Sequence, residues 1–441
     1  MATGNHEFHS SSQFFAGIDP IHPNRRMFMS APSLRFVFIS AILAFALVFG
    51  TVPAGAKTAV VATTAADFSS GAHATIAVTP ENGQRAVQTN LAPTVSDVTV
   101  AAHGSAFFRI ERFMADNVTR FEIDAPATPV WQYSTLDAGE TVTSNPYDLV
   151  FVNENRALLL RFGKAAAWFV NPSTPDAAGF KIGEVDLSPL ADADGIPEMA
   201  GGALVGDRIF VILQRQDRDG GFLPGDGFVA VVDATNGTLI DPGVSTAPGI
   251  PLPARNPQTI RHLPESGLLY IACNGPFPGF GPAEEEYTGG IVTLDPETFE
   301  TTLLVDDGTP ENHPFGTINN LELMSADKGY FVGFDDFGDN SLYAFDPQTG
   351  AVTGPIAPTL QAKNLATLAA GPDGMLWVGD ATEAQVALVD PATDTVVETV
   401  GTGLNPARIV FVEDEDAGNA PPSDDGDGGG GGGCFLNALA R

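Results

Sequence analysis

The stretch ALVDPATD, residues 387–394, decides how this chain is expected to fold. Three apolar residues, the last of them the β-branched Val389, run into Asp390 and Pro391. An Asp at the first position of a turn can bond to the backbone two residues on, and a Pro at the next position presets φ. The segment therefore predicts the end of one strand, a tight turn and the start of a second strand.

The same pattern occurs six more times along the chain. The copies are IAVTPENG (76–83), FEIDAPAT (121–128), FVNPST (169–174), AVVDATNG (230–237), VTLDPETF (292–299) and YAFDPQTG (343–350). The residues that start the turns lie 44 to 62 residues apart, and they are Thr79, Asp124, Asn171, Asp233, Asp295, Asp346 and Asp390. Such self-similarity indicates a repeat architecture.

A second element opens each unit. It is clearest in NPYDLVFV (145–152), NPQTIRHL (256–263) and NPARIVFV (405–412), with weaker versions from Ser96, Met199, Gly316 and Asn364. A further strand such as LLYIACN (268–274) lies between the opening and the turn. Four strands in each unit of roughly 40–60 residues are typical of a β-propeller blade.

The repeats predict an all-β fold, a seven-bladed β-propeller over residues 57–413. The last opening strand, 405–413, has no turn after it, and the first turn, at Thr79, has no opening strand before it. We expect the two ends to share one composite blade, because closure removes exposed strand edges. The alternative is a pair of smaller β domains or a sandwich, although no linker divides this region.

The VDPxT-type turns and the NPxxIxxx openings resemble the YVTN-type repeat propellers, also described as quinoprotein amine dehydrogenase β-chain-like. The resemblance covers residues 58–413, and segment 191–218 resembles a stretch common in uncharacterised exported bacterial propellers. It implies the blade architecture and leaves the function open, because this fold hosts many activities.

Composition limits the classes of partner. The 441 residues carry a net charge of −33, which argues against binding to nucleic acid. An acidic surface suits cations or basic partners, and the alternative is that the acidic side chains only interact with solvent. The two cysteines, Cys273 and Cys434, form no CxxC or CxxCH motif, which argues against zinc ribbons and c-type haem. We expect Cys273 to be a buried apolar residue, with a Cys273–Cys434 disulfide as the alternative.

Both ends differ in composition from the repeats. Residues 1–56 have the layout of a signal peptide with an extended n-region: arginines precede the apolar run FVFISAILAFALVFG (36–50), and a small-residue cleavage point ends at Ala56. The alternative is an uncleaved anchor. Residues 414–441 form an acidic, Gly-rich tether ending in a motif with Cys434, which we interpret as a sorting or attachment signal, or else an incidental tail. We therefore expect an exported protein that is periplasmic, on the cell surface or extracellular.

Candidate ligand-binding residues recur at equivalent strand ends. The loops between second and third strands and the connections between blades should share one face around the channel mouth, where rigid scaffolds commonly place binding sites. The predicted ligand-binding face holds Arg112, Arg161, Arg215, Asp335 and Asp380. The arginines could seat an anionic group, or each could pair with a neighbouring acid.

Two DxD segments on the same face are candidate calcium ligands. They contain Asp192 with Asp194, and Asp217 with Asp219. Calcium prefers six to eight oxygen ligands, and neither segment matches a whole EF-hand loop. We interpret both segments as solvated turns, with a structural calcium site as the alternative, and the sequence indicates no other cofactor.

The functional hypothesis is an exported, non-catalytic binding or surface-displayed propeller. It would be a monomer presenting a loop-rich acidic face to a protein, a glycan or a cation, and would meet a membrane only through the signal segment or a C-terminal attachment. The alternative is a metal-dependent hydrolase or lactonase with its site at the channel mouth. A redox-chain accessory is the weakest option, and no GxSxG motif supports a serine hydrolase.

Overall fold

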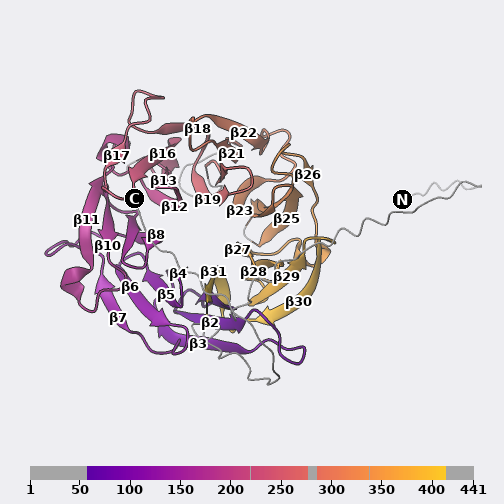
Figure 1. Ribbon diagram of the computed structural model, residues 1–441. Coiled ribbons are helices and arrows are strands. Elements are labelled where there is room, and N and C mark those ends of the chain that lie inside the picture. Colours follow the sequence, from indigo (N-terminus) through magenta and orange to yellow (C-terminus); the bar gives the residue numbers. More distant parts are fainter. Residues whose placement is uncertain (1–56, 219, 277–285, 337, 414–441) are drawn as a thin grey trace, which may run out of the picture. The chain divides into compact units, whose positions relative to one another are not determined.

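The computed structural model describes residues 57–218, 220–276, 286–336 and 338–413. Seven antiparallel sheets stand around a central axis, as Figure 1 shows. The predicted seven-bladed β-propeller is confirmed. The predictions on residues 1–56 with the cleavage at Ala56, on Asp219, and on residues 414–441 with Cys434 lie outside the described residues.

Each blade is given from its innermost strand outward. Blade 1 is β31 (Asn405–Glu413), β1 (Lys57–Thr64), β2 (Gly71–Ala77) and β3 (Val87–Thr94). Blade 2 is β4 (Val98–His103), β5 (Ala106–Glu111), β6 (Asn117–Glu122) and β7 (Trp131–Ser134). Blade 3 is β8 (Pro146–Asn153), β9 (Arg156–Arg161), β10 (Ala166–Val170) and β11 (Lys181–Asp186).

The second half of the ring repeats this order. Blade 4 is β12 (Met199–Val205), β13 (Arg208–Leu213), β16 (Asp226–Asp233) and β17 (Leu239–Ile240). Blade 5 is β19 (Pro257–Leu263), β20 (Leu268–Cys273), β21 (Gly290–Leu294) and β22 (Thr301–Asp306). Blade 6 is β23 (Thr317–Ser325), β24 (Lys328–Asp336), β25 (Asp339–Phe345) and β26 (Val352–Thr353). Blade 7 is β27 (Leu365–Ala370), β28 (Leu376–Asp380), β29 (Gln385–Asp390) and β30 (Thr395–Gly401).

Blade 4 departs from the predicted four strands. The strand β18 (Ile250–Arg255) also pairs with β16, which gives this sheet five strands. The connection between β13 and β16 contains a short hairpin, β14 (Gln216–Asp217) with β15 (Leu223–Pro224). Three single-turn 3-10 helices lie in connections: η1 (Ala177–Gly179), η2 (Ser188–Leu190) and η3 (Pro358–Leu360).

The repeated turns lie between the third and fourth strands, as predicted. The Oδ1 atom of Asp390 accepts a hydrogen bond from the backbone N–H of Ala392 at 2.9 Å. Asp346 and Asp295 accept in the same way, and these bonds hold the pKa of both carboxyls below the ordinary value. The Asp therefore stabilises these three turns by capping backbone donors.

The hydrophobic core is distributed between neighbouring blades. One cluster joins Leu158 and Phe169 of blade 3 to Val211 of blade 4. The next cluster joins Phe210 of blade 4 to Ile271 of blade 5, and Cys273 is fully buried in it. These sheets thus use both faces in packing, which is why third strands such as β10 and β16 contain continuous apolar runs.

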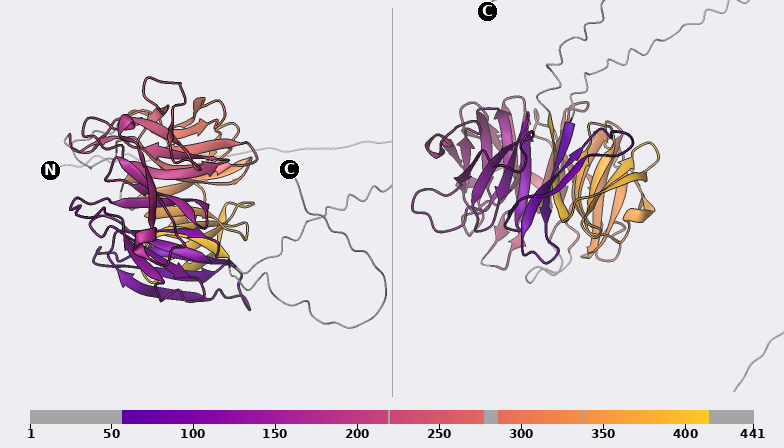
Figure 2. Two further views of the ribbon diagram at one scale, coloured as in Figure 1. Left: turned by 60° about the vertical axis from the view of Figure 1, so that its left-hand side comes forward. Right: turned by 90° about the horizontal axis from the view of Figure 1, so that it is seen from below.

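The predicted composite blade is also confirmed. The strand β31 pairs with β1 from Asn405↔Thr64 to Glu413↔Lys57. Figure 2 shows β31, in yellow, beside the indigo strands of blade 1. Val412 of β31 is fully buried against blade 2 residues such as Phe107, so the end of the propeller sequence closes the ring.

Among the described residues, no helix is both long and apolar enough to cross a membrane.

Candidate functional site

One face of the ring carries the start of all seven innermost strands, and we call it the entry face. The loops after each second strand reach the same face, because second strands run antiparallel to the innermost ones. A hydrogen bond of 2.8 Å from Thr64 Oγ1 to the carbonyl of Ser96 joins a loop of blade 1 to the connection into blade 2. Both kinds of loop therefore meet there, as the sequence predicts.

Large apolar side chains are exposed on adjacent loops of the entry face. They are between 44% and 77% exposed and lie over blades 1 and 2 and at the connection into blade 3. We call this set the apolar arc: Phe68, Val95, Phe113, Met114 and Val142. The five side chains lie on neighbouring loops of one face. Apolar side chains gathered on one surface mark interaction sites on soluble proteins, whereas single exposed side chains need no explanation.

Two members of the arc also have a costly backbone conformation. Phe68 has φ 56° and Met114 has φ 64°, both in the left-handed region. This region costs a residue with a Cβ roughly 1–2 kcal/mol, and Gly or Asn usually occupies it. Neither solvent exposure nor local conformation favours a large hydrophobic residue here, so stability does not account for these side chains.

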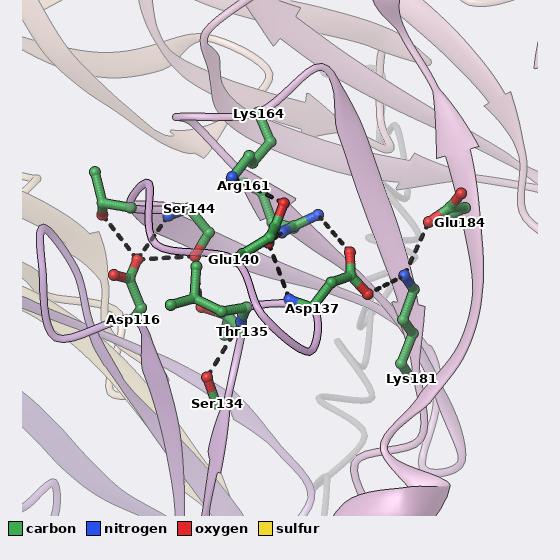
Figure 3. Close-up of polar contacts among 12 residues, drawn as sticks. Asp116, Ser134, Thr135, Asp137, Glu140, Ser144, Arg161, Lys164, Lys181 and Glu184 are labelled. Atoms are coloured by element: carbon green, nitrogen blue, oxygen red, sulfur yellow. Dashed lines mark hydrogen bonds and ion pairs between the residues drawn. The ribbon is translucent and has the colours of Figure 1, made fainter.

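A buried carboxylate anchors the arc from below. Asp116 is 5% exposed, and its Oδ1 accepts hydrogen bonds from the Ser144 backbone N–H at 2.8 Å, the Asn145 N–H at 2.9 Å and the Thr143 hydroxyl at 2.8 Å. The Thr143 hydroxyl in turn accepts from the Met114 N–H at 3.1 Å. The loop carrying Met114 and the connection carrying Val142 are thus tied to one point, as Figure 3 shows for Asp116 and Ser144.

A second network holds the other end of that connection. Glu140 accepts from Arg161 and Lys164, both at 2.9 Å, while Asp137 pairs with Lys181 at 2.7 Å (Figure 3). Burial alone would raise the pKa of the Glu140 carboxyl, but the bond from Lys164, with the nearby Arg161, holds it below its ordinary value. The connection 135–145 is therefore fixed by several charge-assisted contacts, which are stronger than neutral ones.

Arg112 lies between the arc and the channel. Its Nε donates to Asp97 Oδ1 at 2.7 Å, and its guanidinium lies over the Tyr147 ring, 4.6 Å from the centroid. The other Asp97 oxygen accepts from the Phe113 N–H at 3.1 Å. Of the five residues of the predicted ligand-binding face, Arg112 is the one that lines the cavities at the mouth.

Two cavities meet at Arg112. One, of about 380 Å³, is the central channel, lined by residues of all seven innermost strands. The other, of about 360 Å³, opens beside it between blades 1, 2 and 7, and Phe68 lines it. The apolar arc and the channel mouth are therefore neighbours.

The other four predicted residues occupy equivalent strand ends but are not brought together. Arg161 is 2% exposed and is used in the Glu140 network. Arg215 donates to the carbonyl of Asp226 at 3.3 Å, in blade 4, and Asp335 is exposed at the end of the second strand of blade 6. Equivalent positions in different blades lie apart around the ring, so they do not form a single basic sector.

Asp380, in blade 7, is fully buried and has a structural role. Its Oδ1 accepts from the Thr382 N–H at 3.0 Å, and its Oδ2 accepts from the Gln385 amide at 3.1 Å. It caps the loop after its strand, and we do not place it in a ligand site.

The candidate calcium ligands lie within turn networks. Asp192 accepts from the Asp194 N–H at 3.2 Å, and Asp194 accepts from the Arg218 N–H at 3.3 Å. Asp217 accepts from the Gly220 N–H at 2.8 Å. Across the described ranges, no three His, Cys, Asp or Glu side chains are grouped so that they could hold a metal ion.

A buried glutamate that the sequence did not single out lies next to this network. Glu198 is fully buried, accepts from the Gln216 N–H at 2.9 Å and faces the Arg218 Nε at 3.1 Å. Burial raises the pKa of its carboxyl to about 8, and the neighbouring Asp194 contributes. Glu198 anchors the start of the β14–β15 hairpin.

Sequence reasoning also missed the apolar arc. The signal was present in Phe113-Met114, two large apolar residues directly after Arg112 in a segment between strands. A sequence pattern assigns large apolar residues to a hydrophobic core. In the structure these two side chains are exposed to solvent instead.

No family model matches the chain, and no curated protein matches it. Among solved structures, hydrazine synthase from Kuenenia stuttgartiensis is similar with a TM-score of 0.51 and 11% identity, over 70% of this chain and 87% of that one. Apo AztD from Citrobacter koseri has a TM-score of 0.46 and 14% identity, over 81% of this chain and 98% of that one. At these identities the likeness concerns the fold alone, and the fold of this chain is a seven-bladed β-propeller.

Proposed function

We propose that this protein is an exported, non-catalytic binding protein that docks another protein through the apolar arc. The observation that carries the proposal is the exposure of five large apolar side chains on adjoining, anchored loops. An anchored surface loses little conformational entropy on binding, which raises affinity for a given contact area. Loops on a rigid scaffold are a common place for such a surface.

Charge defines the kind of partner. The chain has a net charge of −33, and Asp67, next to Phe68 in the arc, is exposed. A field of this sign steers basic proteins toward the surface and repels both a second copy and anionic lipid. We therefore propose a partner with a basic surface that presents apolar side chains to the arc.

Export rests on the sequence of residues 1–56 and is part of the proposal. Intact-mass analysis of the protein recovered from outside the cytoplasm should give an N-terminus at Lys57. Recovery of the full-length chain from the cytoplasm alone would contradict export.

Docking can be tested by site-specific photo-crosslinking. A photoreactive residue replaces Phe113 in the protein produced in its own host, and Val130 serves as the matched control. Val130 is 54% exposed and belongs to the same blade, but it lies in the turn between the third and fourth strands on the opposite face. We expect a discrete protein adduct at position 113 that high salt weakens and that position 130 does not give.

The same adducts at both positions would contradict the proposal, and so would adducts to lipid alone. The adduct should also disappear when Met114 is changed to Ser, because the two residues belong to one surface.

A further inference from the structure

The central channel offers a second site that is distinct from the apolar arc. Its cavity of about 380 Å³ is lined by polar side chains on innermost strands from several blades. Ligand pockets in proteins span about 300–1,000 Å³, so this cavity suits one small molecule.

Two ion pairs fix the electrostatics of the channel. Arg261 Nε lies 2.9 Å from Glu322 Oε2, and Arg408 Nη2 lies 3.5 Å from Asp148 Oδ2. Arg112 is already paired with Asp97. Each positive group therefore has a negative neighbour, and a charged ligand would have to compete with a pair that exists already.

The channel also has hydrogen-bonding capacity that the protein does not use. In the described part of the chain, the side chains of Asn319, Thr259 and Thr367 line the cavity without a hydrogen-bond partner. The guanidinium of Arg408 makes a single contact of 3.5 Å and keeps other N–H groups for a ligand. The channel wall thus offers both hydrogen-bond donors and hydrogen-bond acceptors, and they come from several blades.

Tyr147 is the one aromatic side chain among the described residues that line the channel, and it does not provide a stacking surface. The guanidinium of Arg112 covers Tyr147 at 4.6 Å, and the ring of Phe162 stacks on Tyr147 at 4.4 Å. A planar aromatic ligand would therefore gain little in this cavity.

From these contacts we infer that the channel binds a neutral, polyhydroxylated small molecule, such as a single sugar or a cyclitol. Each hydroxyl can donate and accept, so it can use carboxylate, amide and guanidinium groups without adding charge. A hydroxyl can also join an existing ion pair without breaking it.

Titration calorimetry on the propeller with glucose, galactose and myo-inositol tests this inference, with glutamate, lysine, citrate and phosphate as charged comparators. We expect saturable one-to-one binding of at least one neutral compound. Asn319→Ala should weaken that binding about fivefold, which corresponds to about 1 kcal/mol for one hydrogen bond. Thr367→Val, which keeps the side-chain shape, should act in the same direction.

The matched control is Gln88→Ala, which removes an exposed amide from the outermost strand of blade 1 and should leave binding unchanged. Absence of binding by all three neutral compounds would overturn the inference. Tighter binding of a charged compound, or equal effects of Asn319→Ala and Gln88→Ala, would also overturn it. Met114→Ser should not alter this binding, so failure here and failure of protein docking at the arc are distinguishable.

Discussion

The Oδ1 atom of Asp116 accepts a hydrogen bond from the backbone N–H of Ser144 at 2.8 Å and so ties the loop after β5 to the connection into blade 3. The same atom accepts from the Ser144 hydroxyl at 2.9 Å and the Asn145 N–H at 2.9 Å. One buried oxygen thus serves several donors at once. This arrangement places Met114 and Val142 at fixed positions on the entry face.

Asp116→Ala should destabilise the propeller by about 3 kcal/mol, because buried donors lose a charged acceptor. Asp116→Asn keeps an oxygen and should cost less. Urea unfolding measures the loss, and hydrogen exchange should locate it in residues 135–145. Asp124→Ala, at an exposed turn of the same blade, is the control and should change stability little. Equal losses for Asp116→Ala and Asp124→Ala would refute the anchoring role.

Met114→Gly should stabilise the fold by up to about 1 kcal/mol while weakening protein docking. Glycine relieves the left-handed conformation at φ 64°, and its own entropic cost offsets part of this gain. Little burial is lost, because the Met114 side chain is 77% exposed. Thermal unfolding gives the stability, and the crosslinking yield at position 113 gives the docking.

The neighbouring residue provides the control for this change. Ala115 does not have a positive φ, so Ala115→Gly should destabilise the fold by about 0.5–1 kcal/mol. If both substitutions destabilise equally, the conformation at Met114 carries no strain.

The blade architecture was predictable because it repeats. Asp390 and four of its counterparts, Asn171, Asp233, Asp295 and Asp346, make the same local bond to the backbone N–H two residues on, so one pattern could be seen several times. The fifth strand of blade 4, β18, was not predictable because no other blade has an equivalent. Local turn chemistry and periodicity determine the blade architecture, whereas the fifth strand depends on a single insertion.

The candidate site was less predictable, because exposure is a tertiary property. Arg161 and Arg112 hold equivalent positions in the sequence repeat, yet Arg161 is 2% exposed and Arg112 lines a cavity. The difference comes from Glu140, which is brought over Arg161 by the connection before blade 3. Nothing in the local pattern around Arg161 shows this burial.

Glu198 should make stability depend on pH in the range between its ordinary pKa of 4.5 and about 8. Its folded-state pKa is raised by burial, so the folded protein holds a proton that the unfolded chain releases in this range. The contribution of Glu198 is fully present below about pH 4.5 and is lost as the pH rises to about 8. Urea unfolding of the protein and of Glu198→Gln at several pH values measures it.

Between pH 5 and 8, the free energy of unfolding should fall less for Glu198→Gln than for the unchanged protein. The two should differ by at most about 1.4 kcal/mol for each pH unit. Glu265→Gln, an exposed acid in the hairpin of blade 5, should follow the unchanged protein. Parallel curves for Glu198→Gln and the unchanged protein would show that Glu198 is ionised throughout.

Ring closure by β31 gives the last prediction. Its register with β1 runs from residue 405 to residue 413, and Val412 and Ile409 are buried against neighbouring sheets. A chain ending at Leu404 would leave β1 as an unpaired innermost edge and expose the cores on both sides of blade 1. We expect this truncation to abolish cooperative unfolding and to cause aggregation. A chain ending at Glu413 retains every strand of the ring and should unfold at the temperature of the full-length protein, as measured by circular dichroism. A folded, monomeric chain ending at Leu404 would show that the other six blades hold the ring without this strand.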